Sequence, residues 1–487
     1  MKRYITYTAI LLASALCSCT DFLDEQLQDD YNGNKFFTNE ANAQRSIIGA
    51  YNTIGFTSAD NYLWVFGDIA SDDSVKGGNP GDMSAGEEID HFEANSDNGI
   101  IAIYWKYAYE TVSQANNIIA YVPGIDMDAA LRSRIVGEAK FLRALSYFHI
   151  VNIWGSVPLR KEPNQNNNAN IVLSDPGTVY QLIKDDLRDA IASPLSAEYS
   201  SPDAGRASLG AAYALMAKVY LFEKNYGECL SAIASLQALN LYELEDDYAD
   251  LFKLGAEDSK EAIFVARHLS DQNPGLGNIL NVYFAPQQEN GYYFNAPTES
   301  FVESFDELTV DGGTDPRLDA SIGRPGQMWM NGEVFDDSWT SNNDTPYLVR
   351  KYNQPLSEVT IGRKSDGGLP FMYLRYADVL LMKAEALAYR NANSQDLEDA
   401  AAALDEVRGR ADLAPTTATT QEALLSAIRK ERRRELGFES HRFFDLMRWG
   451  KEIAEAALGE DFAGKWTGDR YYFPLPLSET DVNQAIE

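Results

Sequence analysis

Cysteine is scarce in this 487-residue chain, which has three, two of them within the first 19 residues. Only Cys229 remains in the body of the chain, so a framework of intrachain disulfides and a cysteine-based metal site are both excluded there. The four histidines are scattered and lack the paired spacing of a metal site. We therefore expect no metal and no cofactor, and a fold that its core alone holds together.

Positive charge is also in short supply, with 41 Lys and Arg against 73 Asp and Glu and a formal net charge of −32. A body this acidic repels phosphate backbones, so we expect no nucleic-acid partner. One segment, "ERRRELGFESHRFFDLMRWG" at 431–450, nevertheless holds five arginines, beside four acids. Arg432 lies four residues after Ile428 on the apolar stripe of a predicted helix, so at least one arginine faces inward. Buried arginines need carboxylate partners, and we predict internal Arg–carboxylate pairs here.

Catalytic motifs are missing as well. "GRASLG" and "GDMSAG" miss the GxSxG spacing by one residue, "GLGNIL" lacks the third glycine of a dinucleotide fingerprint, and no GxxxxGK[ST] loop occurs. Among 73 acids a pair of carboxylates suited to glycoside hydrolysis is not excluded by counting. We predict that the chain is not an enzyme and keep a surface glycoside hydrolase as an alternative.

The N-terminus has the pattern of a lipoprotein signal peptide. Lys2 and Arg3 precede a short apolar run that ends in Leu16-Cys17-Ser18-Cys19. A lipoprotein signal peptidase needs a small residue before the cysteine, which Ser18 supplies for Cys19. We predict a signal peptide over 1–18, lipidation of Cys19 and a membrane attachment through that lipid. An ordinary secretory signal is the alternative, and no later apolar stretch approaches 18 residues.

Apolar periodicity predicts a mainly α fold. "AAYALMAKVYLFEKNYGECLSAIASLQAL" and "YADVLLMKAEALAYRNANSQDLEDAAAALDEVRGRADL" each place small and aromatic residues as a tetratricopeptide-type helical hairpin requires. The insertion between them, about 269–345, is rich in Asn, Gly, Asp, Tyr and Trp and predicts irregular structure with little β. "EAIFVARHL" and "YLVRKY" at its flanks are candidate short strands. A generic helical bundle is the alternative.

Several stretches, in order along the chain, resemble one family. They are "CTDFLD", "SIIGAYN", "AKFLRALSYFHIVNIWGSVPL", "GRASLGAAYALMAKVYLF", "YLRYADVLLMKAEAL", "VRGRADL", "AIRKERRRELGFESHRFFDLMRWG" and "FPLPLSETDVNQ". Together they resemble the SusD/RagB family of nutrient-binding outer-membrane lipoproteins.

The resemblance implies about four tetratricopeptide-like hairpins in a right-handed superhelical scaffold, with an N-terminal SusD-like region over 19–230 and a C-terminal RagB/SusD region over 231–487. It also implies a non-catalytic, cell-surface protein that binds an oligosaccharide ligand and acts as the lid of a SusC-like TonB-dependent transporter. Two alternatives stay open: a peptide- or glycoprotein-binding lid of the same kind of transporter, and a tetratricopeptide scaffold that binds only its protein partner.

A sugar binder needs exposed aromatic platforms with polar groups at their edges. Loops are the natural place for them, and in the resembled family the contacts come mainly from regions that correspond to 57–98 and 271–345. We predict as ligand-binding residues Trp64, Asp73, Tyr292, Tyr293, Asn295, Trp329 and Trp339. For each, the alternative is an aromatic that anchors a loop or a solvated polar residue.

Overall fold

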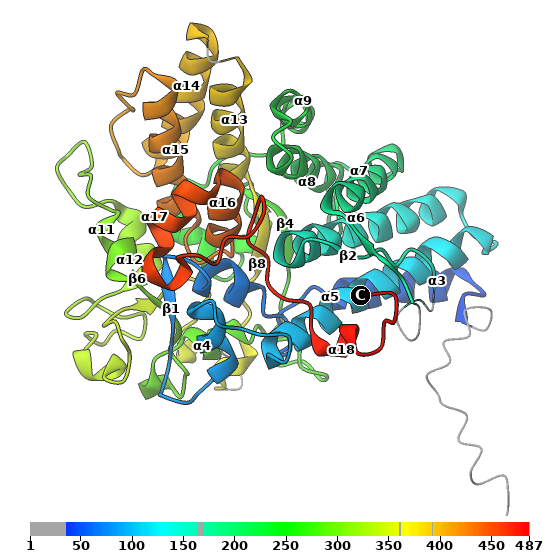
Figure 1. Ribbon diagram of the computed structural model, residues 1–487, viewed down its shortest axis with the longest axis horizontal. Helices are drawn as coiled ribbons and strands as arrows, with labels where there is room; N and C mark the ends of the chain where they lie inside the picture. The colour runs from blue at the N-terminus through cyan, green and yellow to red at the C-terminus, as the bar shows by residue number, and fades with distance from the viewer. Residues whose placement is uncertain (1–35, 164, 166–169, 360–361, 392, 487) are drawn as a thin grey trace, which may run out of the picture.

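A computed structural model describes residues 36–163, 165, 170–359, 362–391 and 393–486 of the chain. The predicted signal peptide and the lipidation site Cys19 lie outside the described residues. As the periodicity predicted, the described part is mainly α-helical (Figure 1).

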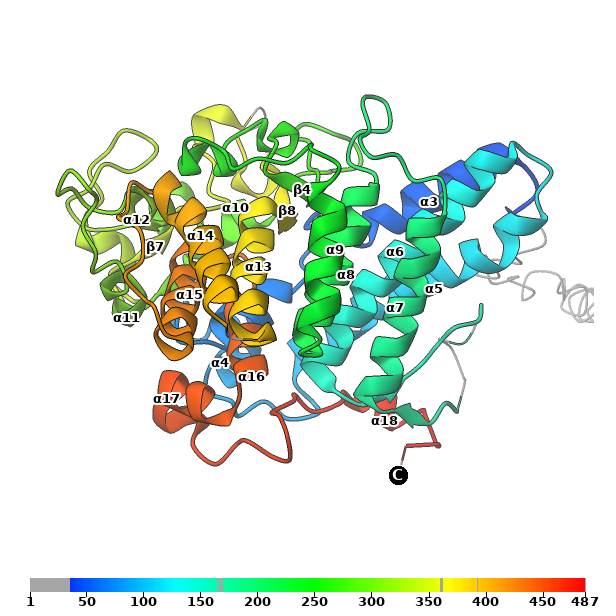
Figure 2. The same cartoon turned by 90° about the horizontal axis from the view of Figure 1, so that it is seen from above.

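Four helix pairs form the scaffold: α3 (Glu40–Asn52) with α5 (Gly99–Tyr121), α6 (Ala129–Trp154) with α7 (Pro176–Ala192), α8 (Leu209–Phe222) with α9 (Tyr226–Gln237), and α13 (Tyr376–Arg390) with α14 (Ser394–Arg410). Seen from above, the pairs stand side by side, and α15 (Gln421–Leu436) packs beside α13 and α14 (Figure 2). Both predicted hairpins, at α8–α9 and α13–α14, are confirmed, as is the tetratricopeptide-like arrangement.

The scaffold helices begin where a side chain can satisfy their free N–H groups. Asn98 accepts from the N–H groups of Ile100 and Ile101 at the start of α5, and Ser208 accepts from Ala211 at the start of α8. Helix α6 is buried over almost its whole second half, which explains why "AKFLRALSYFHIVNIW" is apolar on nearly every face.

Small sheets and short helices fill the rest of the structure. The described residues form four antiparallel strand pairs: β1 (Ser74–Gly77) with β5 (Phe294–Pro297), β2 (Val157–Pro158) with β3 (Leu173–Ser174), β4 (Ala262–Ala266) with β8 (Phe371–Arg375), and β6 (Ile322–Gly323) with β7 (Leu348–Val349). The short helices are α4 (Ser84–Asp90), α10 (Leu280–Phe284), α11 (Glu299–Glu303), α12 (Pro316–Ser321), α16 (Arg442–Trp449), α17 (Lys451–Phe462) and α18 (Leu477–Thr480). The predicted strands at the flanks of the insertion are confirmed as β4 and β7.

The arginines of the basic segment are internal, as predicted. Arg432 donates from Nη1 to Asp378 at 2.8 Å and from Nε to Asp445 at 2.9 Å. Arg433 and Arg434 project from other faces of α15. Arg433 donates to Asp73 and Arg434 donates to Asp306, each at 2.6 Å. These charge-assisted bonds join α15 to the scaffold, to the segment before β1 and to the insertion.

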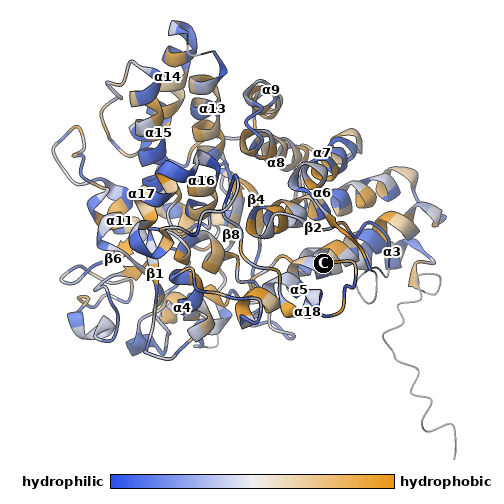
Figure 3. Ribbon diagram, in the orientation of Figure 1, coloured by the Kyte–Doolittle hydropathy of each residue, from blue (hydrophilic) through white to orange (hydrophobic). Residues whose placement is uncertain are grey.

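In Figure 3 each long helix carries both polar and apolar residues along its length. Across the described ranges, no helix combines the length and the apolarity that a membrane crossing requires.

Candidate functional site

The two predicted ligand regions meet in the structure. Strand β1, from the segment 57–98, pairs with β5, from the insertion, in the register Ser74↔Pro297 and Gly77↔Phe294. The close approach depends on Gly78, because a Cβ there would lie 2.4 Å from the Phe294 ring. Segments that are more than 200 residues apart in sequence therefore lie side by side.

Most of the predicted aromatic platforms are buried, however. Trp64 is 1% exposed and packs on Tyr283 and Phe284, with ring centroids 5.7 and 5.3 Å away. Trp329, Trp339 and Tyr293 form with Phe335 and Leu348 a small core inside the insertion, which we call the tryptophan cluster. The expectation that these four rings are exposed is wrong: Trp64 belongs to the main core, and the insertion is long enough to bury the other three in a core of its own.

The two predicted polar residues are also buried, and their partners lie within the protein. Asp73 is fully buried and accepts from Arg433. Asn295 accepts from the Ser74 hydroxyl at 2.6 Å and donates to Asp68 at 3.3 Å. Both join segments of the fold, which corrects the expectation that they offer free polar groups to a ligand.

Tyr292 is the predicted residue that the structure leaves at the surface, with 46% of the side chain exposed. Its ring stacks on the Phe294 ring at 5.3 Å with 12° between the planes, and lies 5.9 Å from the Tyr283 ring. Phe294 is buried beneath it. Tyr292 is therefore an aromatic ring held flat on a rigid base, with its remaining surface open to water.

Two further tyrosines extend this surface. Tyr283 and Tyr62 are half-buried, and each packs against the buried Trp64, with centroids 5.7 and 6.4 Å away. We call Tyr62, Tyr283 and Tyr292 the tyrosine platform. Trp64 thus contributes to it from below, as a support for two of its three rings.

The phenol groups of Tyr62 and Tyr283 are neutral at neutral pH. Burial raises the pKa of Tyr62, and the nearby Asp60 carboxylate raises it further. Burial likewise raises the pKa of Tyr283, with smaller contributions from Tyr62, Tyr292 and Asp60. Each hydroxyl can therefore donate a hydrogen bond as well as accept one.

The Asp60 carboxylate lies near the platform, since its charge acts on both Tyr62 and Tyr283. Asp60 is exposed and accepts from the Ser58 hydroxyl at 3.2 Å. Between Tyr283 and Tyr292 the chain exposes Gln287, Gln288 and Asn290. Of the residues predicted from the sequence, Tyr292 belongs to this surface, whereas Tyr62 and Tyr283 were not among them.

Residue type was the signal that could have found the platform. A tyrosine has an apolar ring and a polar tip and suits the boundary between core and water, whereas tryptophan is buried more fully on average. Tyr62 and Tyr283 were missed because each stands next to a larger or more apolar aromatic, Trp64 in one case and Phe284 in the other.

Within the described ranges, no group of three or more His, Cys, Asp or Glu side chains is placed to hold a metal ion. His91 is exposed and pairs with Asp461 at 3.1 Å. His268 and His441 are buried, and burial lowers the pKa of both, to about 4 and about 3 respectively.

Comparisons with known proteins agree with this architecture. The sequence profile described as "SusD family" matches residues 260–487, and the profile described as "Starch-binding associating with outer membrane" matches residues 21–221. The chain belongs to the SusD/RagB family and has its tetratricopeptide-like helical fold.

Individual relatives match over nearly the full length. A SusD-like protein of Formosa agariphila is 26% identical, over 100% of this chain and 98% of its own. A solved structure described as a laminarin-binding SusD-like protein is 29% identical, with a TM-score of 0.78 over 92% of this chain and 99% of that one. Surface glycan-binding protein A of Bacteroides thetaiotaomicron, solved in complex with laminarihexaose, is 23% identical and shares the fold with a TM-score of 0.76, over 92% and 98% of the two chains.

Proposed function

We propose that the protein is a non-catalytic glycan-binding lipoprotein of the outer membrane, which captures oligosaccharides on the tyrosine platform. The observation that carries this proposal is the set of three tyrosines at the surface on a buried aromatic base. A sugar ring has an apolar C–H face that can lie on such a ring. Because Trp64 and Phe294 fix the platform from below, little side-chain freedom is lost when a sugar binds.

The edge of the platform suits the hydroxyl groups of a sugar. Asp60 and the exposed amides of Gln287, Gln288 and Asn290 offer acceptors and donors around the aromatic surface. Each such bond is worth about 1 kcal/mol net, because water competes for the same groups. Affinity then depends mainly on the stacking, and specificity on the polar edge.

The names of two relatives suggest which glycan to test first. One is described as laminarin-binding and another was solved with laminarihexaose. We propose laminarin oligosaccharides as the first ligands, with starch oligosaccharides as the second because of the description of the N-terminal profile.

Titration calorimetry with these oligosaccharides tests the proposal. We expect Tyr292→Ala to weaken binding by about tenfold or more, since stacking on an aromatic ring and its burial together contribute about 1–3 kcal/mol. Tyr121→Ala is the matched control: Tyr121 is also half-exposed and stacks on a phenylalanine, Phe37, at 5.4 Å, but at the C-terminal end of α5.

Three results would contradict the proposal. An equal loss of glycan affinity in Tyr292→Ala and Tyr121→Ala would show that the platform is not the binding site. Binding of oligopeptides alone would favour the peptide-binding alternative. Release of reducing sugars that one carboxylate substitution abolishes would show a glycoside hydrolase.

We further propose that residues 1–18 are removed and that the lipidated Cys19 anchors the mature protein, with the N-terminal region 19–230 and the C-terminal region 231–487 forming one lid on a SusC-like TonB-dependent transporter. The small Ser18 before Cys19 and the family membership support this proposal. Expression of Cys19→Ala in the native host tests the anchor: the variant should leave the membrane fraction. Co-purification of the unaltered protein with a barrel protein tests the partner, and a protein that elutes alone would contradict it.

A further inference from the structure

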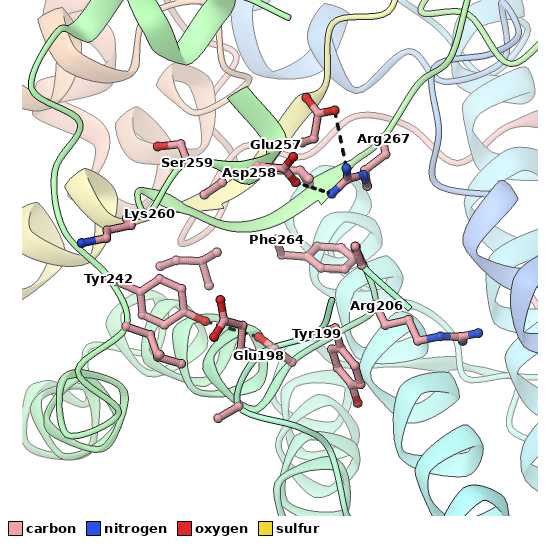
Figure 4. Close-up of a pocket in the computed structure, with 18 residues that line it drawn as sticks. Glu198, Tyr199, Arg206, Tyr242, Glu257, Asp258, Ser259, Lys260, Phe264 and Arg267 are labelled. Carbon is pink, nitrogen blue, oxygen red and sulfur yellow. Dashed lines mark hydrogen bonds and ion pairs between the residues drawn. The ribbon is translucent and has the colours of Figure 1, made fainter. Parts of the chain in front are cut away.

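A second cavity lies away from the tyrosine platform and shares no residue with it. It has a volume of about 240 Å³ and opens between the loop 193–208, which joins α7 to α8, and strand β4 (Figure 4). The segment 257–260 before β4 and Tyr242 after α9 complete its walls. We call it the β4 cavity.

The aromatic walls of the β4 cavity are fixed by packing. Phe264 is 2% exposed, and its ring meets the Phe141 ring edge to face at 4.8 Å. Tyr242 lies over Gly210 of α8, where a Cβ would come within 2.0 Å of the tyrosine hydroxyl. The hydroxyl is also 3.4 Å from the Ser208 hydroxyl. The two rings therefore keep their places without a ligand.

The positive groups around the cavity are already neutralised. Arg267 lies 3.0 Å from Asp258 and 3.5 Å from Glu257 (Figure 4). Lys260 pairs with Glu243 at 2.9 Å. Arg206 points away from the other labelled side chains in Figure 4 and pairs with two acids outside the cavity, Asp203 and Glu138.

Two carboxylates that line the cavity, Glu198 and Glu257, have oxygen atoms without a protein partner among the described residues. In the part of the chain that the structure describes, the Glu198 carboxylate has no hydrogen-bond or ion-pair partner. It lies near Tyr242: burial raises the pKa of that phenol, and the Glu198 charge raises it too. Oε2 of Glu257 is shielded from solvent and likewise has no hydrogen-bond partner among the described residues. The cavity, which two aromatic rings also line, thus offers the unpaired, solvent-exposed carboxylate of Glu198 and one shielded oxygen of Glu257.

We propose that the β4 cavity binds an amino sugar, a single polyhydroxyl ring that carries a protonated amine. The ammonium group would pair with Glu198, and Glu257 Oε2 would accept from a hydroxyl elsewhere on the ring. The C–H face of the ring would lie against Tyr242 and Phe264. The volume suits one substituted ring, since a cavity of about 150 Å³ already holds benzene. An anionic ligand would meet the unpaired Glu198 charge and be repelled.

Titration of the full chain with glucosamine tests this inference, with glucose and N-acetylglucosamine as comparators that keep the ring and lack the charge. We expect glucosamine to bind about threefold to fivefold more tightly than either comparator, because an exposed charge pair contributes up to about 1 kcal/mol. Glu198→Gln should remove that advantage and leave the affinity for glucose unchanged. Glu198 is exposed, so this variant is expected to fold.

Two controls separate the cavity from the rest of the acidic surface. Glu452→Gln removes an exposed acid on α17 and should leave glucosamine binding unchanged. Tyr292→Ala should also leave it unchanged, so failure here and failure of the proposed glycan binding are distinguishable. Any of four results would overturn the inference. Glucosamine could bind no more tightly than glucose, or could fail to bind at all. The Glu198→Gln variant could bind glucosamine as tightly as the unaltered protein, or methylamine could bind as tightly as glucosamine.

Discussion

The tryptophan cluster and two of the three platform tyrosines, Tyr283 and Tyr292, come from the same insertion but have opposite environments. Tyr293 is 1% exposed within the cluster, whereas Tyr292, the preceding residue, is 46% exposed on the platform. The cluster contains two tryptophans and a phenylalanine that pack on one another, and the surface of the platform consists of tyrosines alone. An aromatic-rich loop can thus build both a core and a binding surface, and the difference lies in which rings have a polar tip that can reach water.

Removal of a cluster ring should have the largest effect. Trp329 is 2% exposed, donates from Nε1 to Glu289 at 3.2 Å, and packs so closely on Gly323 that a Cβ there would come within 2.4 Å of its ring. We expect Trp329→Ala to lower the free energy of unfolding by about 3–5 kcal/mol, measured by urea denaturation. If the variant kept its stability and lost glycan binding, the cluster would be a binding surface after all and the contrast would fail.

The second prediction concerns a buried polar junction where the segment 57–98 meets the insertion. Asp68 accepts from the Ser440 N–H at 2.8 Å and from Asn295, and burial raises its pKa to about 8. Between pH 4 and 8 the folded protein therefore retains a proton that the unfolded chain has lost, so this group's contribution to stability falls as the pH rises through that window. The slope is at most about 1.4 kcal/mol per pH unit.

Asp68→Asn isolates that contribution, since the variant cannot titrate at this position. Urea denaturation at pH 5, 6.5 and 8 should show the unaltered protein losing stability relative to Asp68→Asn as the pH rises. Asp90, whose pKa burial raises to about 7, titrates in both proteins and cancels in the difference. A difference that stayed constant with pH would show that Asp68 is ionised throughout.

Local sequence predicted the scaffold well. The i, i+4 relation of Ile428 and Arg432 correctly placed an arginine inside, because helix geometry fixes which side chains share a face. The small and aromatic residues of α8 and α13 correctly indicated helical hairpins. These features depend on contacts between neighbours in sequence or on one regular period.

Exposure within the two loop regions, 57–98 and the insertion, could not be predicted in the same way. Whether Trp64 or Tyr62 faces water depends on the pairing of β1 with β5 and on the position of α10, which are contacts between distant parts of the chain. The same holds for Asp73, whose burial depends on Arg433 of α15. A loop composition rich in Gly, Asn and Trp indicates irregular backbone, but it does not state which side of that backbone is inside.

The third prediction separates stability from binding on the platform. Because Tyr292 is nearly half exposed, Tyr292→Ala should change the free energy of unfolding by about 1 kcal/mol or less while weakening glycan binding as described above. Urea denaturation and calorimetry on the same preparation provide both values. A loss of several kcal/mol would mean that Tyr292 belongs to the core, like Tyr293.

The smallest effect is expected for Tyr283→Phe, which keeps the ring against Trp64 and removes only the hydroxyl. Since burial raises the pKa of Tyr283, the hydroxyl is protonated at neutral pH and is free to donate to a sugar oxygen. One neutral hydrogen bond contributes about 0.5–1.5 kcal/mol, so affinity should fall about two- to tenfold with stability nearly unchanged. Calorimetry with Tyr283→Phe and Tyr292→Ala side by side ranks the two contributions. A loss in Tyr283→Phe as large as in Tyr292→Ala would mean that hydrogen bonding, and not stacking, dominates recognition on the platform.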